Sequence, residues 1–303
     1  MSERPQPERT FVIGQAALTA RALEPALYLV ATPIGNLGDI TIRALETLAA
    51  ADIVACEDTR ITRRLLERYA IRRKPIAYHE HNAAEAGPKL LAALKEGRSV
   101  ALVSDAGTPL VSDPGFRLAR QVLDADGKVV PIPGASAPLA ALVASGLPSD
   151  SFFFAGFLPA KAGQRRTRLA ALAPVPATLI FFESPRRLAD TLAAMAEALG
   201  GSRQAAVCRE LTKAYEEVRR GTLAELGRHY AEAGAPKGEV VVCVAPPADD
   251  APHAPEDVDA LLLELAAEMP AAKAAGEAAR MTGGTKTDLY RRLIALKAEA
   301  DGR

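Results

Sequence analysis

The sequence predicts an α/β protein with a mostly parallel sheet in its first part, and three observations support this. From Leu27 onward, short apolar runs alternate with segments of helical period, which is the pattern of βαβ units. Turns rich in Gly, Pro and small polar residues follow several of these runs. The composition, 49% hydrophobic and 24% charged over 303 residues, is that of a globular protein long enough for two domains and an appendage.

Two series of strands are expected. The first lies at 27–31, 52–56, 76–79, 99–104 and 128–132, and the second at 152–155, 178–183, 205–210, 215–219 and 239–244. One helix is predicted to begin with Asp113 as its N-cap and Pro114 at its first position. Another is predicted to begin at Ser184-Pro185, with apolar residues on one face at Leu188, Leu192, Met195 and Leu199.

The chain is expected to comprise five segments. Residues 1–25 lack a convincing period and predict a loosely held extension. Gly146, Pro148 and Ser149 interrupt the apolar pattern and mark the boundary between two α/β domains. A Pro/Asp-rich linker precedes roughly three short helices, broken at Pro270 and at Gly283-Gly284. The segments are therefore an extension (1–25), an N-terminal α/β domain (26–145), a C-terminal α/β domain (146–246), a linker (247–255) and a helical module (256–303).

Composition excludes several classes of protein. The three cysteines, Cys56, Cys208 and Cys243, are far apart and contain no CxxC spacing, which favours reduced thiols in a cytoplasmic protein over a disulfide framework or a metal site. No signal sequence or membrane-spanning stretch is predicted. Lys and Arg number 37, as do Asp and Glu, so a surface for nucleic acid must come from local clusters.

Small polar turns at strand ends are where ligands bind in open α/β sheets. The first, Ala31–Thr41, follows the strand at 27–31 and leads into a helical pattern. Four more such segments are Cys56–Arg60, Ser104–Pro109, Pro131–Ala137 and Phe182–Arg187. The sequence lacks both GxGxxG after the first strand and GxxxxGK[ST], so it does not predict a dinucleotide or P-loop site.

Five segments taken together resemble the tetrapyrrole-methylase superfamily of S-adenosylmethionine-dependent enzymes, over about residues 27–245. They are ATPIGNLGDIT, ACEDTRITRRLL, VSDAGTPLVSDPGF, PIPGASA and FFESPRRL. Within it they are similar to the branch that modifies small-subunit ribosomal RNA, and the C-terminal helices resemble that branch's extra module. Corrin and porphyrin methylases carry Gly-Asp-Pro where this chain has Ser104-Asp105-Ala106, a departure that favours the RNA branch.

The resemblance implies two α/β domains with S-adenosylmethionine in the cleft between them, usually in a homodimer. The branch 2′-O-methylates a cytidine in the decoding region of 16S rRNA, so 16S rRNA or the small ribosomal subunit is the expected partner. The cofactor-binding positions carried over by motif are Ile34, Ser104, Asp105, Thr108, Ser136, Ala137, Glu183 and Leu211. Of these, Asp105 or Glu183 would hold the ammonium group or the ribose hydroxyls, and turn N–H groups the carboxylate.

A 2′-hydroxyl is a poor nucleophile, so a general base or a group that lowers its pKa is expected. The acidic candidates are Glu57, Asp58 and Asp39, with Arg60 and Asn36 as groups that would orient them. Structural roles remain open, because Asp39 would serve equally as a helix cap and Arg60 as an ion-pair partner of Glu57 or Asp58.

Three basic clusters predict an RNA-facing side, because phosphate contacts supply much of the affinity for RNA. The first, from Arg60 to Lys74, includes Arg63 and Arg64; the second lies in an expected loop at 161–168; the third follows the Gly-Gly turn. Their leading residues are Arg63, Arg64, Lys161, Arg165, Arg166, Lys286, Arg291 and Arg292. Aromatic residues, at 5%, are too few for an extended stacking platform.

Two alternatives stay open at this point. One is a methylase of a small tetrapyrrole precursor, against which the arginine clusters argue. The other is a non-catalytic RNA- or ribosome-binding protein that keeps a relic cofactor pocket.

Overall fold

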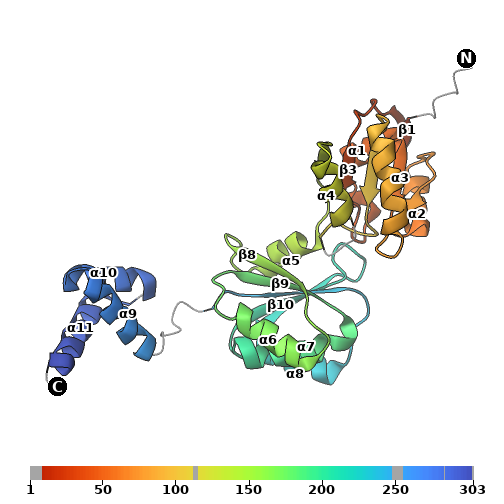
Figure 1. Cartoon of the computed structure of the whole chain (residues 1–303). Helices are drawn as coiled ribbons and strands as arrows, with labels where there is room; N and C mark the ends of the chain where they lie inside the picture. Colours follow the sequence, from red (N-terminus) through yellow and green to blue (C-terminus); the bar gives the residue numbers. More distant parts are fainter. Residues whose placement is uncertain (1–8, 112–114, 248–254, 283, 302–303) are drawn as a thin grey trace, which may run out of the picture. The chain divides into compact units, whose positions relative to one another are not determined.

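The computed structural model describes residues 9–111, 115–247, 255–282 and 284–301. It divides into two compact units, one of residues 1–172 and 177–245 and the other of residues 173–176 and 246–303 (Figure 1). Among the residues described, those of the first unit form two five-stranded sheets and a small hairpin, and those of the second form three helices.

The first sheet is entirely parallel, as predicted, in the order β5-β4-β6-β3-β7. Parallel strands joined by helices are covered on both faces, which explains why all four residues of β6 are buried. The strands are β3 (Leu27–Val30), β4 (Ile53–Cys56), β5 (Ile76–Ala77), β6 (Val100–Val103) and β7 (Val129–Ile132). The connecting helices are α1 (Ile42–Ala50), α2 (Thr59–Arg68), α3 (Ala83–Lys95) and α4 (Phe116–Asp124), with a short 3-10 turn, η1 (Leu37–Asp39), before α1.

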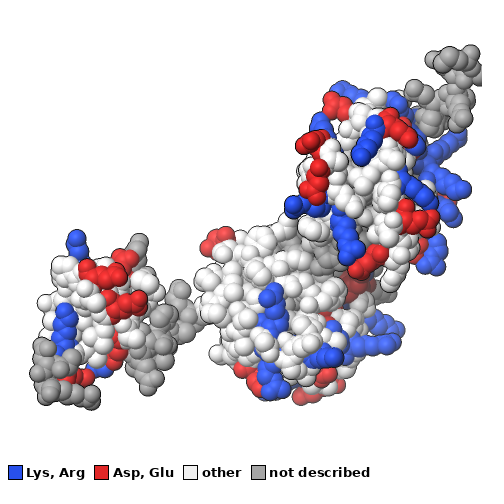
Figure 2. Space-filling model, viewed as in Figure 1, with Lys and Arg blue, Asp and Glu red and all other residues white. Residues whose placement is uncertain are grey.

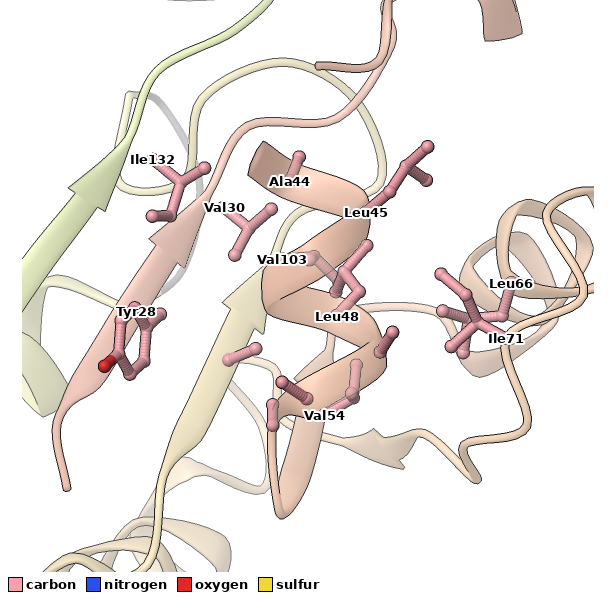
Figure 3. Packing of buried hydrophobic residues seen from close by; sticks show 14 of the residues in the cluster. Tyr28, Val30, Ala44, Leu45, Leu48, Val54, Leu66, Ile71, Val103 and Ile132 are labelled. Carbon is pink, nitrogen blue, oxygen red and sulfur yellow. The ribbon is translucent and has the colours of Figure 1, made fainter. Parts of the chain in front are cut away.

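One face of this sheet packs against α1 and α2. Figure 3 shows Val30 and Val103 facing Leu45 and Leu48 of α1, all of them almost fully buried. Burying each of these side chains contributes about 1.5–3 kcal/mol relative to exposure. The other face packs against α3 and α4 through a second apolar cluster that includes Leu90.

The second sheet is mainly antiparallel, in the order β11-β10-β12-β9-β8, and only its β8–β9 pair is parallel. The strands are β8 (Phe152–Phe157), β9 (Thr178–Glu183), β10 (Gln204–Arg209), β11 (Glu217–Thr222) and β12 (Val240–Val244). Figure 1 shows α5 on one face and α6, α7 and α8 on the other. These helices are α5 (Ala137–Ser145), α6 (Ala162–Leu172), α7 (Leu188–Leu199) and α8 (Leu223–Ala233).

Helix α5 joins the two sheets. It falls inside the predicted 26–145 segment and directly follows the first sheet, yet Ala141 and Leu142 pack with Ile180 and Ala206 of the second sheet. The chain therefore crosses from one sheet to the other at the turn before α5.

The predicted helix at Ser184-Pro185 is confirmed, since the 3-10 turn η2 (Pro185–Arg187) runs directly into α7. Leu188, Leu192 and Met195 are fully buried on one face. The predicted start at Asp113 and Pro114 lies outside the described residues. Helix α4 itself begins at Phe116.

The prediction of a loosely held N-terminal extension is wrong for the part that is described. β1 (Thr10–Ile13) and β2 (Ala16–Thr19) form an antiparallel hairpin, in which Phe11 is buried against α1 and α2. The backbone N–H of Val12 also donates to the carbonyl of Tyr69 at 2.8 Å. The sequence pattern missed this hairpin because both strands are only four residues long and all of β2 is exposed, which leaves no alternation to detect.

The second unit contains the three helices that the sequence predicts, α9 (Pro255–Glu268), α10 (Ala271–Thr282) and α11 (Lys286–Asp301). They share a small core formed by Leu262, Ala274, Ala275, Ala278, Leu289 and Leu293. None of the helices described in either unit has the length and apolar character needed to cross a membrane.

Candidate functional site

A cavity of about 440 Å³ lies at the edge of the two sheets in the first unit, a size typical of small-molecule sites, which span roughly 300–1,000 Å³. The first sheet contributes the loops after β3, β6 and β7. The second contributes the ends of β8, β9 and β10 and the start of β12. The residues from the first sheet and α5 are Ile34, Asp105, Ala106, Gly107, Thr108, Val111, Ser136, Ala137 and Pro138. Those from the second are Phe157, Phe182, Glu183, Ser184, Pro185, Cys208, Leu211, Lys213, Gly238, Glu239, Val240 and Val241.

The loops after β3 and β6 are hydrogen-bonded to each other at the cavity wall, where Gly107 lies. Thr32 and Gly107 form an antiparallel bridge, with N···O distances of 2.8 and 3.0 Å. Gly107 has φ +78°, a conformation that L side chains rarely adopt. A Cβ at this position would lie 3.5 Å from Cγ2 of Ile34. This is an ordinary contact distance, so the positive φ of the turn, and not lack of space, favours glycine here.

Ser104 does not line the cavity, unlike the other residues that the resemblance assigned to cofactor binding. It is buried, and its hydroxyl donates to the carbonyl of Ala106 at 3.2 Å. Its own carbonyl accepts from the hydroxyl of Thr32 at 3.3 Å. Ser104 therefore shapes the turn that carries Asp105 and Thr108.

Asp105 lies on the cavity wall and is partly exposed. Its Oδ1 accepts from the backbone N–H of Asp58 at 2.9 Å. This bond orients the carboxylate, and Oδ1 has further acceptor capacity, as has Oδ2. Asp105 is thus the partly exposed carboxylate that the first sheet presents to a ligand.

Glu183 reaches the cavity from the end of β9, but its carboxylate is held within the protein. The side chain is only 1% exposed. Oε1 accepts from the backbone N–H of Ser184 at 2.7 Å, and Oε2 from the hydroxyl of Thr191 at 2.6 Å. Nε of Arg187 lies 3.4 Å from Oε1. These partners indicate that Glu183 mainly anchors the turn into α7, rather than holding a ligand's ammonium group.

Lys213 and Glu239 line the cavity and were missed by the sequence analysis. Nζ of Lys213 lies 2.6 Å from Oε1 of Glu210 and 2.7 Å from Oε2 of Glu239. Partial burial lowers the pKa of Lys213, but the two carboxylates outweigh it and the net shift is upward. The signal that could have found Lys213 is its place directly after the strand expected at 205–210.

The proposed catalytic residues lie beside the cavity rather than on its wall. None of Asn36, Glu57, Asp58 and Arg60 is among its lining residues. Asn36 caps η1, its side-chain oxygen accepting from the N–H of Gly38 at 3.0 Å. Asp58 caps α2 and pairs with Arg60 at 2.6 Å. Hydrogen bonds from Arg60 lower the pKa of Asp58 to about 2.

Asp39 belongs to η1 and is not its cap, because Asn36 caps η1 and Thr41 caps α1. Its Oδ2 is buried without a hydrogen-bond partner. The structural alternative of a capping role is therefore wrong for Asp39, whereas the alternative of an ion pair between Arg60 and Asp58 is observed.

Basic side chains gather over α2, as Figure 2 shows. Arg63, Arg64 and Arg68 are exposed on this helix. Arg73, by contrast, serves the fold, since its Nε and Nη2 donate to the carbonyl of Ala49 at 3.0 and 2.7 Å.

The second basic cluster was predicted as a loop, and this is wrong. Lys161 immediately precedes α6, and Arg165 and Arg166 lie on it. Only Leu169 and Leu172 of this helix are buried, so its first two turns carry no apolar period for a pattern to detect. The guanidinium of Arg168 lies 6.0 Å from the ring centroid of Phe153.

The third cluster lies on α11, where ion pairs engage part of its charge. Arg292 pairs with Asp259 of α9, and Arg291 lies 3.6 Å from Asp288. Lys286, at the start of α11, is exposed.

Cysteines and possible metal ligands offer no further site. All three cysteines are free and buried. Among the residues that the structure describes, no group of three or more His, Cys, Asp or Glu side chains is arranged to hold a metal ion.

The fold and the cavity define a class of proteins. Residues 26–227 match the family model "Tetrapyrrole (Corrin/Porphyrin) Methylases". Two solved structures share this fold. Uroporphyrin-III-C-methyltransferase from Thermus thermophilus superposes with a TM-score of 0.54 at 24% identity, covering 73% of this chain and 94% of that one. Diphthine synthase superposes with a TM-score of 0.58 at 18% identity, covering 73% and 90%.

Curated relatives indicate which family within this class the chain resembles. Ribosomal RNA small subunit methyltransferase I from Mesorhizobium japonicum is 70% identical, over 96% of this chain and 100% of its own length. The Pseudomonas aeruginosa protein of the same name is 48% identical, over 88% and 96%. Residues 252–297 match the model "RsmI C-terminal HTH domain". The chain therefore belongs to the tetrapyrrole methylases and, within them, to the ribosomal RNA small subunit methyltransferase I family.

Proposed function

We propose that this protein transfers a methyl group from S-adenosylmethionine to the 2′-oxygen of a cytidine ribose in the decoding region of 16S rRNA. The main support for the proposal is the set of residues that line the cavity. Of the residues assigned to cofactor binding by resemblance, all but Ser104 line it. The relatives named as small-subunit rRNA methyltransferases support the choice of substrate.

The cavity fits S-adenosylmethionine chemically. This cofactor supplies a methyl group on a cationic sulfur, and its remaining parts are a planar aromatic adenine, a ribose and a zwitterionic amino acid. Phe157, Phe182 and Val241 provide apolar lining for a planar base. Asp105 provides a carboxylate for an ammonium group or ribose hydroxyls.

The carboxylate of the cofactor is expected at the start of α5. Ser136 is the N-cap of this helix and makes no side-chain capping bond. Its hydroxyl and the backbone N–H of Ala137 are therefore the donors expected to meet the carboxylate, since Pro138 has no N–H and the N–H of Ala140 donates to the carbonyl of Ser136. The helix dipole also favours a negative charge at this end. Ala137 and Pro138 complete this wall.

Methyl transfer is an in-line displacement, so most of the help that the protein gives comes from positioning the 2′-oxygen. Asp58 would be a weak base near neutral pH, because its pKa is about 2. Glu57 is therefore the stronger acidic candidate at this position, with Arg60 and Asn36 orienting the ribose.

RNA contacts are proposed at the exposed cations of the three basic clusters, which would meet phosphates. The residues are Arg63, Arg64, Lys161, Arg165, Arg166, Lys286, Arg291 and Arg292. The helical module, residues 256–303, is proposed to grip RNA. Deleting residues 253–303 should leave S-adenosylmethionine binding unchanged and weaken methylation of the RNA. Unchanged methylation by the shortened chain would contradict this role. We further propose that the protein acts as a homodimer in the cytoplasm and needs no metal.

The test is transfer of labelled methyl from S-adenosylmethionine to purified small subunits and to protein-free 16S rRNA, with the product mapped by nucleotide. Label at one ribose 2′-oxygen in the decoding region is the expected result. Cofactor binding without transfer to either substrate would favour a methylase of small tetrapyrroles. Neither binding nor transfer would favour a non-catalytic ribosome-binding protein.

A further inference from the structure

We propose that Lys213 is a positioning residue, which holds the loop after β3 at its working distance from the loop after β10 by seating its aliphatic stem on Gly35. The inference rests on the proposed function, because the loops concerned line the proposed donor cavity. It concerns a residue that neither the sequence motifs nor the resemblance assigned.

The stem of Lys213 occupies the space where a side chain at position 35 would lie. A Cβ on Gly35 would be 2.8 Å from Cε and 3.1 Å from Cδ of Lys213, and closer still to Cγ. Because the contact involves most of the stem, rotating the end of the lysine would not relieve it. Gly35 is therefore required here by a close neighbour, and this neighbour comes from the other sheet.

The amine of Lys213 is fixed at two points. It lies 2.6 Å from Glu210 and 2.7 Å from Glu239. Oε1 of Glu210 also accepts from the backbone N–H of Glu239 at 3.0 Å. A Cβ on Gly238 would collide with the Glu210 carboxylate. A second glycine thus makes room for the group that holds the lysine.

The segment that carries Lys213 has an unusual backbone. Glu210 and Thr212 both have positive φ, 51° and 65°, although neither is glycine. Such conformations cost energy and persist only where surrounding contacts impose them. The N–H of Thr212 donates to Oε2 of Glu216 at 2.6 Å. Leu211 lies between the two strained residues and lines the cavity.

Leu211 and Ile34 belong to the same apolar cluster and both line the cavity. Ile34 directly precedes Gly35 in the chain, and Leu211 lies two residues before Lys213. Changing that contact should therefore move Ile34 against Leu211 and alter the shape of the site for the donor. We expect the effect mainly in donor Kd and in KM for S-adenosylmethionine, with the KM for RNA unchanged.

The test is a double-mutant cycle on the full chain, read by calorimetric S-adenosylmethionine binding and by rRNA methylation. Gly35→Ala should weaken donor binding about tenfold, because a displaced loop disturbs a preformed site. Lys213→Ala should weaken it less. Gly35→Ala combined with Lys213→Ala should be no worse than Lys213→Ala alone, because the clash disappears with the stem.

Two further variants sharpen the test. Lys213→Met keeps the stem and removes both ion pairs, so Gly35→Ala should still be harmful in its presence. Gly227→Ala, within α8, is the matched control, since its Cβ would meet only ordinary contacts at 3.9 Å, and it should leave binding and activity unchanged. If Gly35→Ala is too unstable for binding measurements, the melting temperatures of the wild type, the two single variants and the double variant are compared in the same cycle. Lys213→Ala should then restore the melting temperature that Gly35→Ala lowers.

Independent, multiplying effects of Gly35→Ala and Lys213→Ala would overturn the inference while leaving the proposed function intact. Absence of S-adenosylmethionine binding by the wild-type chain would instead overturn the proposed function, and the inference with it.

Discussion

The two sheets of the first unit bring residues to the cavity in different ways. In the parallel sheet, the loops that reach the cavity all follow carboxyl ends, after β3, β6 and β7. In the second sheet, β9 and β10 both run antiparallel to β12, with Glu183 and Arg209 each paired to Val240. The ends of β9 and β10 therefore meet the beginning of β12. The segments after the carboxyl ends of strands therefore include all the loops that the parallel sheet contributes to the cavity. In the second sheet they omit the start of β12, which also lines it.

The two carboxylates Asp105 and Glu183, one from each sheet, show the same contrast. Each follows or ends an apolar strand and lines the cavity. Asp105 accepts one backbone hydrogen bond and is partly exposed, whereas Glu183 is buried with both oxygens engaged. We therefore expect Asp105 to act mainly on the ligand and Glu183 mainly on stability.

The largest effect is expected for Glu183→Ala. It removes the acceptor of two hydrogen bonds and leaves buried donors unpaired, which should lower the free energy of unfolding by about 3 kcal/mol. Glu183→Gln, which keeps one acceptor oxygen, should cost less. Urea denaturation of both variants measures the difference. A loss for Glu183→Ala no greater than for Asp105→Ala would remove the contrast between the sheets.

Gly107→Ala should come next. The substitution forces an L side chain into positive φ, which costs about 1 kcal/mol, and strains the bridge to Thr32. Affinity for S-adenosylmethionine should fall about tenfold, which corresponds to about 1.4 kcal/mol. Gly14→Ala is the matched control, since Gly14 has φ +61° but lies in the hairpin with no atom near its Cβ. Calorimetry showing equal donor affinity in both variants would refute the role of this turn.

A smaller effect is expected for Asp105→Asn. The amide oxygen would still accept from the N–H of Asp58, so stability should change little. Loss of the negative charge should weaken donor binding about fivefold, because charge-assisted hydrogen bonds are roughly twice as strong as neutral ones. Calorimetry and thermal melting separate the two effects. A drop in melting temperature with unchanged donor affinity would make Asp105 a structural residue.

The smallest effect concerns pH and the loop after β4. Arg60 lowers the pKa of Asp58 from 3.8 to about 2. Because the folded pKa is depressed, the ion pair contributes stability above the ordinary pKa and loses it as pH falls through about 2. Arg60→Ala should return the Asp58 pKa toward 3.8, as followed by NMR titration of the carboxyl carbon. An unchanged pKa in this variant would show that another group lowers it.

Much of the fold could be predicted from the sequence because the relevant signals are local. Apolar runs identified both strand series, and the Ser184-Pro185 turn identified the start of a helix whose buried face was also correct. The N-terminal hairpin and the first turns of α6 could not be found this way. Their exposed residues carry no period, and their positions depend on contacts with distant parts of the chain, such as that of Val12 with Tyr69.

For the site, the sequence by itself determined the turns after β3, β6, β7 and β9, because glycine, proline and small polar residues encode a turn within a few positions. Only the tertiary structure decided which side chains share the cavity. It placed Glu239 there through the antiparallel direction of β12, and it seated Lys213 on Gly35 from the opposite sheet. Such contacts join residues far apart in the chain, and their geometry depends on strand order and register, which no local pattern specifies.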